Sequence, residues 1–170
     1  LLLGGTDWAE KNNIELRLKQ TVSQVLPNEN SIIINDDDSN KKLSPDFLVI
    51  ATGSEPTIPP ITGAKQKGVF TLRSMDDAKD IKEASENKQV VIVGTGFIGM
   101  ELASALMEAG KVASITIVGR SPRVMSNIVS ESISDALIDL HKEKGVNFAF
   151  GANVAEIVQD NGMVSGVVLD

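Results

Sequence analysis

The sequence predicts an α/β fold in which helices cover a parallel sheet. Three observations support this prediction. Apolar runs of strand length recur along the chain, apolar residues at helical spacing lie between them, and glycines stand where the helices would end. With 42% hydrophobic and 23% charged residues among 170, the composition is that of one globular domain, or of one domain with part of another.

The first third of the chain reads as extended hairpins. Alternating apolar residues predict strands over 14–18 and 21–26, and residues 31–34 follow as the hairpin partner of the second strand. Residues 36–42 predict a polar hairpin tip, whose three aspartates are expected to face solvent rather than to bind a metal. The continuous apolar run 47–51 predicts a strand that is buried on both faces.

A linker and a helix follow these hairpins. Three prolines between residues 56 and 60 mark an irregular linker, and residues 69–72 predict a short strand. Ser74 predicts the N-cap of a helix that reaches about Ser85, because the acidic residues that come after it suit the positive end of a helix dipole.

From residue 89 onward, strands and helices alternate. The expected elements are a strand at 89–93, a helix at 97–109, a strand at 114–118, a helix at 131–144, a strand at 146–150 and a closing hairpin of 152–159 with 163–169. The order strand, helix, strand predicts a βαβ unit with a parallel pair of strands.

The turn between strand 89–93 and helix 97–109 carries the most specific motif of the chain, GxGxxG. In this position Gly94 allows the tight turn out of the strand, Gly96 lets a diphosphate approach the backbone, and Gly99 lets the helix pack closely on the strand. The free N–H groups and the positive end of the helix then face an anion. In this context the motif predicts a dinucleotide site, and the alternative is a plain glycine-rich turn.

The end of the next strand predicts which nicotinamide cofactor binds. Sites that prefer NADH place a carboxylate there to accept hydrogen bonds from the ribose 2′-hydroxyl. Here Val118 is followed by Gly119, Arg120 and Ser121. Arg120 and Arg123 are placed to meet a 2′-phosphate, to which Ser121 would add a hydroxyl donor. We therefore expect NADPH, with NADH and a solvent-facing Arg120 as the alternative.

The two ends of the chain resemble each other. Residues 14–18 and 21–25 match residues 146–150 and 152–157 in a constant register, and a hairpin follows each match. The register favours duplication over coincidence. Because the chain also begins without Met, we expect it to be a segment that contains the end of one nucleotide-binding unit and most of a second.

Composition and charge exclude several other classes of protein. The net charge of −7, without a cluster of Lys and Arg, argues against a nucleic-acid partner, and no apolar run is long enough to cross a membrane. No signal-peptide pattern is present, so we expect a cytoplasmic location. Without cysteine, the segment holds no disulfide, thiolate zinc or iron–sulfur site. The single histidine, His141, is expected on a solvated helix face.

Taken together, these motifs resemble the FAD- and NAD(P)-dependent pyridine nucleotide-disulfide oxidoreductase superfamily. The segments that carry the resemblance stand in the order of that superfamily: the second FAD-contact motif at 46–56, the crossing between domains at 59–63, the start of the NAD(P) domain at 68–74 and the cofactor fingerprint at 93–101. Residues 73–78 and 121–126 favour the ferredoxin (rubredoxin) reductase and apoptosis-inducing-factor-like branch.

The resemblance implies a Rossmann-like two-dinucleotide-binding-domain flavoprotein fold, with a parallel sheet, helices and β-hairpin (meander) crossovers. It assigns residues 1–62 to the C-terminal part of the first FAD-binding segment and residues 63–170 to the NAD(P)H-binding domain, whose last strand is expected to be missing. It also implies the cofactor-binding residues: Val25, Ala51, Thr52 and Gly53 for FAD, the cradle of Gly94, Thr95, Gly96, Phe97, Ile98 and Gly99 for the nicotinamide dinucleotide, and Glu101 near the nicotinamide or a flavin-side lysine. No residue is expected to act as an acid–base catalyst or a metal ligand.

The implied activity is oxidation of NAD(P)H by FAD, with electrons passed to an acceptor such as ferredoxin or rubredoxin. The expected partners are the nicotinamide dinucleotide, FAD, a redox protein and, in the full-length protein, a second copy. The segment alone is expected not to complete the redox cycle. Three alternatives stay open: a nucleotide-sensing module like apoptosis-inducing factor, a disulfide reductase whose redox cysteines lie upstream, and the NAD(P) domain of another dehydrogenase family, against which the motif at 51–53 argues.

Overall fold

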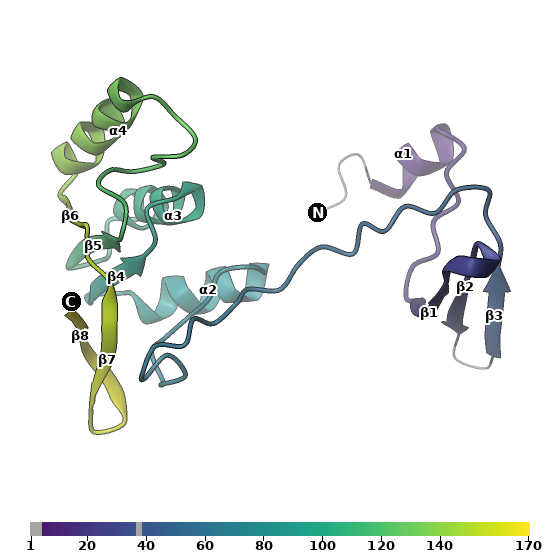
Figure 1. Cartoon of the computed structure of the whole chain (residues 1–170), viewed down its shortest axis with the longest axis horizontal. Helices are drawn as coiled ribbons and strands as arrows, with labels where there is room; N and C mark the ends of the chain where they lie inside the picture. The colour runs from purple at the N-terminus through teal and green to yellow at the C-terminus, as the bar shows by residue number, and fades with distance from the viewer. Residues whose placement is uncertain (1–4, 37–38) are drawn as a thin grey trace. The chain divides into compact units, whose positions relative to one another are not determined.

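The computed structural model describes residues 5–36 and 39–170 (Figure 1). They belong to two compact units, which divide between Gly53 and Ser54. Two of the three aspartates at the predicted hairpin tip, Asp37 and Asp38, lie outside the described residues.

The first unit holds a short helix and a three-stranded antiparallel sheet. Helix α1 spans Gly5–Lys11, a 3₁₀ turn covers Pro27–Glu29, and the strands β1 (Thr21–Leu26), β2 (Ser31–Asp36) and β3 (Ser39–Leu43) pair in that order. The predicted hairpin of β1 and β2 is confirmed. Residues 39–42, predicted as part of a polar loop, form the strand β3 together with Leu43; among the described strands β3 pairs only with β2, and residues 40–42 are exposed to solvent.

Two strands that the sequence predicts for this unit are not formed. Residues 14–18 and 47–51 pair with none of the described strands, and an extended segment becomes a strand only when a neighbour accepts and donates its backbone hydrogen bonds. Phe47 and Val49, predicted to be buried, are 89% and 83% exposed. The repeat is therefore only partly visible in the structure. Of the two matching segments that begin it, residues 146–150 form the strand β6, whereas residues 14–18 form no strand.

The second unit contains a parallel sheet with helices. Its elements are α2 (Met75–Ala84), β4 (Gln89–Val93), α3 (Phe97–Glu108), β5 (Ser114–Gly119), α4 (Glu131–Glu143), β6 (Val146–Phe150), β7 (Val154–Asp160) and β8 (Met163–Leu169). Strands β4, β5 and β6 pair in parallel in that order; α3 packs on β4 and β5, and α4 packs on β6 (Figure 1). Ile115 and Ile117, on the central strand, are fully buried. This is the Rossmann-like α/β fold that the sequence predicts.

The hairpin of β7 and β8 joins the linker segment of the same unit. The Ile157 N–H donates to the Thr62 carbonyl oxygen at 2.8 Å. At the hairpin tip Asn161 and Gly162 have φ values of +49° and +76°, as a two-residue turn with both residues at positive φ requires. The strand predicted at 69–72 is not formed, because no described strand pairs with it.

His141 is buried, so the prediction of a solvated position is wrong. The residue is 5% exposed, its Nδ1 lies 2.8 Å from the Leu137 carbonyl oxygen, and its Nε2 lies 3.0 Å from Ser104 Oγ on α3. Its charged sequence neighbours point elsewhere, because the helical period places His141 on the buried face of α4 with Ser134 and Ile138.

The N-cap predicted at Ser74 is confirmed and includes a reciprocal hydrogen bond that the side chain of Asp77 accepts. Asp77 N–H donates to Ser74 Oγ at 3.1 Å, and the N–H groups of Ser74 and Arg73 donate to Asp77 Oδ2 at 2.7 and 2.9 Å. These backbone hydrogen bonds lower the pKa of Asp77 below its ordinary 3.8. The cap is therefore complete above about pH 4 and is lost as the pH falls through the lowered value.

The variant Ser74→Ala is expected to lower the free energy of unfolding by about 1 kcal/mol at neutral pH, since it removes the side-chain acceptor of the cap. Urea titration would measure the change. Ser165→Ala, at an exposed position of β8, is the control and should change little. An equal loss in both variants would contradict the assignment of the cap.

Within the residues that the structure describes, no helix is long and apolar enough to cross a membrane.

Candidate dinucleotide site

The glycine turn joins β4 to α3 and is tied to the neighbouring strand. Gly94 has a φ of +122°, a conformation that residues with a Cβ rarely adopt. Its N–H donates to the Val118 carbonyl oxygen of β5 at 2.8 Å. The tight turn predicted at this glycine is confirmed.

The other two glycines of the motif differ in what surrounds them. A Cβ on Gly99 would overlap the Gly94 carbonyl oxygen and lie 3.4 Å from Ile92 Cγ2, which confirms the predicted close packing of helix on strand. A Cβ on Gly96 would meet nothing within 4 Å, so the space beside this residue is open. The backbone at Gly96 is therefore accessible to a ligand, as the approach of a diphosphate requires.

The N-terminus of α3 is free of internal caps. Gly96 is its N-cap and offers no side chain, no side-chain hydrogen bond caps the helix, and its first turn contains no acidic residue. In contrast, α2 satisfies its own N-terminus through Ser74 and Asp77. The N–H groups of the first turn of α3 and its positive dipole end are thus available to an anion.

The corner at the end of β5, Gly119 to Ser121, holds no carboxylate. A Cβ on Gly119 would lie 2.6 Å from Thr95 Cγ2, so the threonine of the glycine turn occupies the space of a side chain there. The next residue, Arg120, is exposed and has no hydrogen bond or ion pair among the described residues. Ser121 is half-buried, and its carbonyl oxygen accepts the Gly151 N–H at 3.4 Å.

Arg123 differs from Arg120 in its surroundings. Its Nη1 donates to the Val129 carbonyl oxygen at 3.1 Å, and its Nη2 donates to the Ser126 carbonyl oxygen at 3.0 Å. The guanidinium is half-buried inside the loop that follows β5. Of the two arginines predicted to meet a 2′-phosphate, Arg120 alone has its guanidinium free of such bonds.

Glu101 lies on α3 beside a hollow between α2 and α3. The hollow measures about 560 Å³, and its floor is apolar. The charged side chains at its rim are Arg73, Lys82 and Glu101, and Ile98 of the glycine motif lines it as well. Sequence reasoning missed Arg73, which precedes α2, and Lys82, within α2, because no local pattern shows that these residues and α3 line one hollow.

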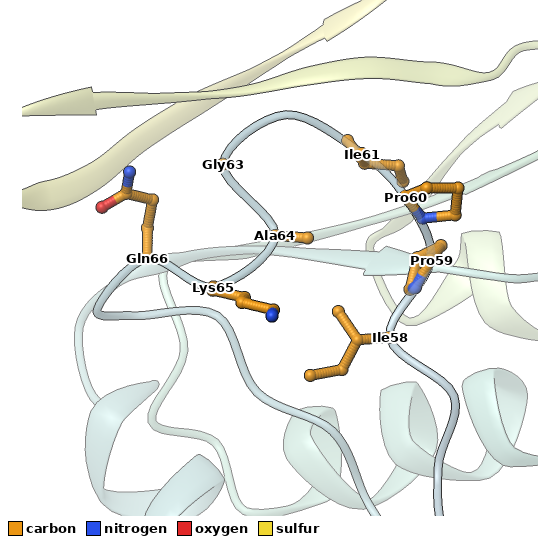
Figure 2. A pocket seen from close by; sticks show the side chains of 8 residues that line it. All are labelled: Ile58, Pro59, Pro60, Ile61, Gly63, Ala64, Lys65 and Gln66. Carbon is orange, nitrogen blue, oxygen red and sulfur yellow. The ribbon is translucent and has the colours of Figure 1, made fainter.

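A second hollow lies in the linker loop and is separate in sequence from the glycine turn. It measures about 510 Å³ and is lined by residues 58–61 and 63–66 (Figure 2). Figure 2 shows the side chains of Ile58 and Lys65 pointing toward each other across it, while Gln66 points away. Lys65 is its one charged lining residue and no lining residue belongs to the glycine motif, so we do not assign the dinucleotide to this hollow.

The residues that the resemblance assigns to FAD lie in the first unit. Val25 is on β1 and is 39% exposed. Ala51, Thr52 and Gly53 lie in the exposed segment that ends this unit, and Gly53 has a φ of +80°.

Known proteins resemble the chain along nearly its whole length. It matches the pyridine nucleotide-disulphide oxidoreductase family over residues 7–170. The ferredoxin–NAD(+) reductase component of 3-phenylpropionate/cinnamic acid dioxygenase from Photorhabdus laumondii is 31% identical over 149 residues, which are 87% of this chain and 36% of the relative. Terpredoxin reductase from a Pseudomonas species is 32% identical over 170 residues, which are 99% of this chain and 39% of the relative.

A solved structure agrees with these relatives. The ferredoxin reductase for the CYP199A2 system from Rhodopseudomonas palustris superposes with a TM-score of 0.80 at 25% identity, over 96% of this chain and 39% of that one. The chain thus spans little more than a third of the length of these relatives. It belongs to the pyridine nucleotide-disulphide oxidoreductase family.

Proposed function

We propose that the chain is the nicotinamide-dinucleotide-binding part of an FAD-dependent oxidoreductase that takes hydride from NAD(P)H and passes electrons to a ferredoxin-type protein. The observation that carries the proposal is the open, uncapped glycine turn at the N-terminus of α3. The printed names of the relatives, a ferredoxin–NAD(+) reductase component and a terpredoxin reductase, support the redox partner.

The proposal assigns residues 1–62 to the end of the FAD-binding segment and residues 63–170 to the NAD(P)H-binding domain. The structure groups residues 54–62 with the second unit. The proposed domain boundary, after residue 62, therefore lies nine residues beyond the boundary between the two compact units, after Gly53. Ala51, Thr52, Gly53 and Val25 remain the proposed contacts of FAD.

The glycine turn and the start of α3 have proposed tasks in binding the dinucleotide. The N–H groups from Gly96 to Gly99 bind the diphosphate, and the missing side chain at Gly96 lets it approach. Glu101, at the rim of the hollow between α2 and α3, lies toward the nicotinamide or a lysine of the flavin domain. The flavin supplies the hydride acceptor when bound, and this chain binds and orients the donor.

The free guanidinium of Arg120 supports NADPH over NADH. The name of the Photorhabdus relative states NAD+ for that protein, so the choice in this chain depends on its own corner at Gly119 and Arg120. A guanidinium suits a phosphate because its planar fork donates two parallel hydrogen bonds.

The variant Arg120→Ala is expected to weaken NADPH binding by at least about tenfold, since a hydrogen bond to a charged group contributes roughly 1.5–3 kcal/mol. NADH binding should stay within about twofold, because NADH has no 2′-phosphate. Isothermal titration with both nucleotides would measure the dissociation constants. Arg17→Ala, at an arginine of the first unit that pairs with Glu15, is the control. Tighter binding of NADH that does not respond to Arg120→Ala would overturn the NADPH assignment.

The catalytic part of the proposal needs the full-length protein. Reduction of an artificial electron acceptor by NADPH with bound FAD is the expected result. Nucleotide binding without any such turnover would favour a nucleotide-sensing module instead.

A further inference from the structure

A hydrogen bond joins the glycine turn to the loop that follows β5. The Met125 N–H donates to the Thr95 carbonyl oxygen at 2.9 Å. In a planar trans peptide unit the C=O and the N–H point in opposite directions. Because the Thr95 carbonyl is held toward Met125, the N–H of Gly96 is directed away from this loop. The loop therefore sets the direction of one of the donors that a diphosphate would use.

Met125 makes this bond from an unusual backbone conformation. Its φ is +49°, which is unfavourable for a residue with a Cβ, and the residue is 8% exposed. Its carbonyl oxygen accepts the N–H groups of Ile128 and Val129 at 2.8 and 3.1 Å. Such a conformation persists only where the surrounding structure holds it.

Arg123 and Ser134 hold the loop around Met125. The guanidinium of Arg123 donates to the carbonyl oxygens of Ser126 and Val129, so one planar group joins two points on the far side of Met125. On the near side, Ser134 Oγ of α4, which is fully buried, donates to the Val124 carbonyl oxygen at 2.7 Å. Three backbone carbonyls that flank Met125 are thereby fixed.

We propose that Arg123 is a positioning residue for the dinucleotide, acting through Met125 and Thr95 on the glycine turn rather than by contact with a 2′-phosphate. The inference rests on the proposed function of the turn, and it reassigns a residue for which the sequence predicted a phosphate contact. Arg120, whose guanidinium is free, keeps that contact.

The variant Arg123→Lys tests the proposal, because lysine keeps the charge but cannot bridge two carbonyl oxygens with a planar fork. We expect NADPH and NADH to bind more weakly by the same factor, about tenfold, as when a partner that orients a binding residue is removed. The Met125 amide should exchange faster with solvent, while the Ile117 amide of the central strand should not change. That pair of amides separates a local loosening of the loop from a general loss of stability.

Two further variants complete the design. Ser134→Ala removes the other restraint and should also weaken both nucleotides, and it carries the test if Arg123→Lys does not fold. Arg120→Ala is the matched comparison and should weaken NADPH alone.

Three results would decide against the inference or its basis. A loss of NADPH affinity with unchanged NADH affinity in Arg123→Lys would make Arg123 a phosphate ligand and overturn the proposal. Unchanged affinities with unchanged exchange at Met125 would overturn it too. If the unaltered protein binds neither nucleotide, the proposed function fails and the positioning role with it, whereas exchange at Met125 still decides whether Arg123 restrains the loop.

Discussion

Replacing Gly96 by alanine is expected to weaken the binding of both NADPH and NADH by about a hundredfold, the equivalent of one or two charge-assisted hydrogen bonds. The added methyl group would project into the open space beside the turn, where the diphosphate has to approach the backbone. The diphosphate would then be held away from the N–H groups of α3.

The same substitution should leave the fold nearly unchanged. Gly96 has φ −87° and ψ −173°, an extended conformation that alanine adopts freely, and a Cβ there meets no atom within 4 Å. Isothermal titration and urea unfolding would measure the two quantities separately. Gly166→Ala on β8, where a Cβ also meets nothing, is the control and should change neither. Unaltered nucleotide binding in Gly96→Ala would show that the ligand does not use this turn.

Replacing Gly99 by alanine is expected to destabilise the protein by roughly 1–3 kcal/mol, the usual cost of overpacking. The new Cβ would overlap the Gly94 carbonyl oxygen, which belongs to the backbone of the turn and cannot rotate out of the way. Helix α3 would have to move away from β4, and nucleotide affinity should fall with it.

The sign of the change in the free energy of unfolding distinguishes two explanations. Gly99 lies within α3, and helix propensity alone predicts that alanine would stabilise the helix by about 1 kcal/mol. The close contact predicts the opposite direction. Urea unfolding of Gly99→Ala, with Gly166→Ala again as the control, would distinguish the two. A gain in stability would mean that the helix does not pack on the turn as described.

Much of the second unit could be predicted from the sequence because its signals are local. The apolar runs at β4, β5 and β6, the helical spacing in α4 and the glycines after α3 and α4 each mark an element by themselves. The positive φ of Gly94 and the close packing at Gly99 followed from the motif in the same way. Binding of the cofactors at these residues stays a prediction.

Strands in the first unit and the linker could not be predicted with the same success. The runs at 14–18, 47–51 and 69–72 have the composition of strands, but each lacks a paired neighbour among the described residues. In contrast, residues 39–43, the first four of which are polar, lack that composition and form a strand, because β2 pairs with them. A sequence pattern shows which side chains of a strand would be buried, but it does not show whether another strand lies beside it to form the backbone hydrogen bonds.

The site shows the same limit at the level of side chains. The sequence gives no reason to treat Arg120 and Arg123 differently, since both follow β5. The structure distinguishes them, because the guanidinium of Arg123 donates to two backbone carbonyl oxygens of its loop and that of Arg120 does not. Thr95, in the glycine turn, lies close to Gly119, at the end of β5, and because the two residues are distant along the chain, no local sequence pattern predicts this proximity. His141 was placed by its charged neighbours, although the helical period with Ser134 and Ile138 was available in the sequence.

Amide NMR spectra during a titration with ADP-ribose would test the central claim most directly, because this ligand carries the diphosphate but no nicotinamide. We predict that the amide signals of Gly96, Phe97, Ile98 and Gly99 shift and saturate together, and that adenosine, which lacks the diphosphate, leaves them in place. ADP-ribose that binds without moving these four signals, or that does not bind at all, would contradict the assignment of the glycine turn as the dinucleotide site.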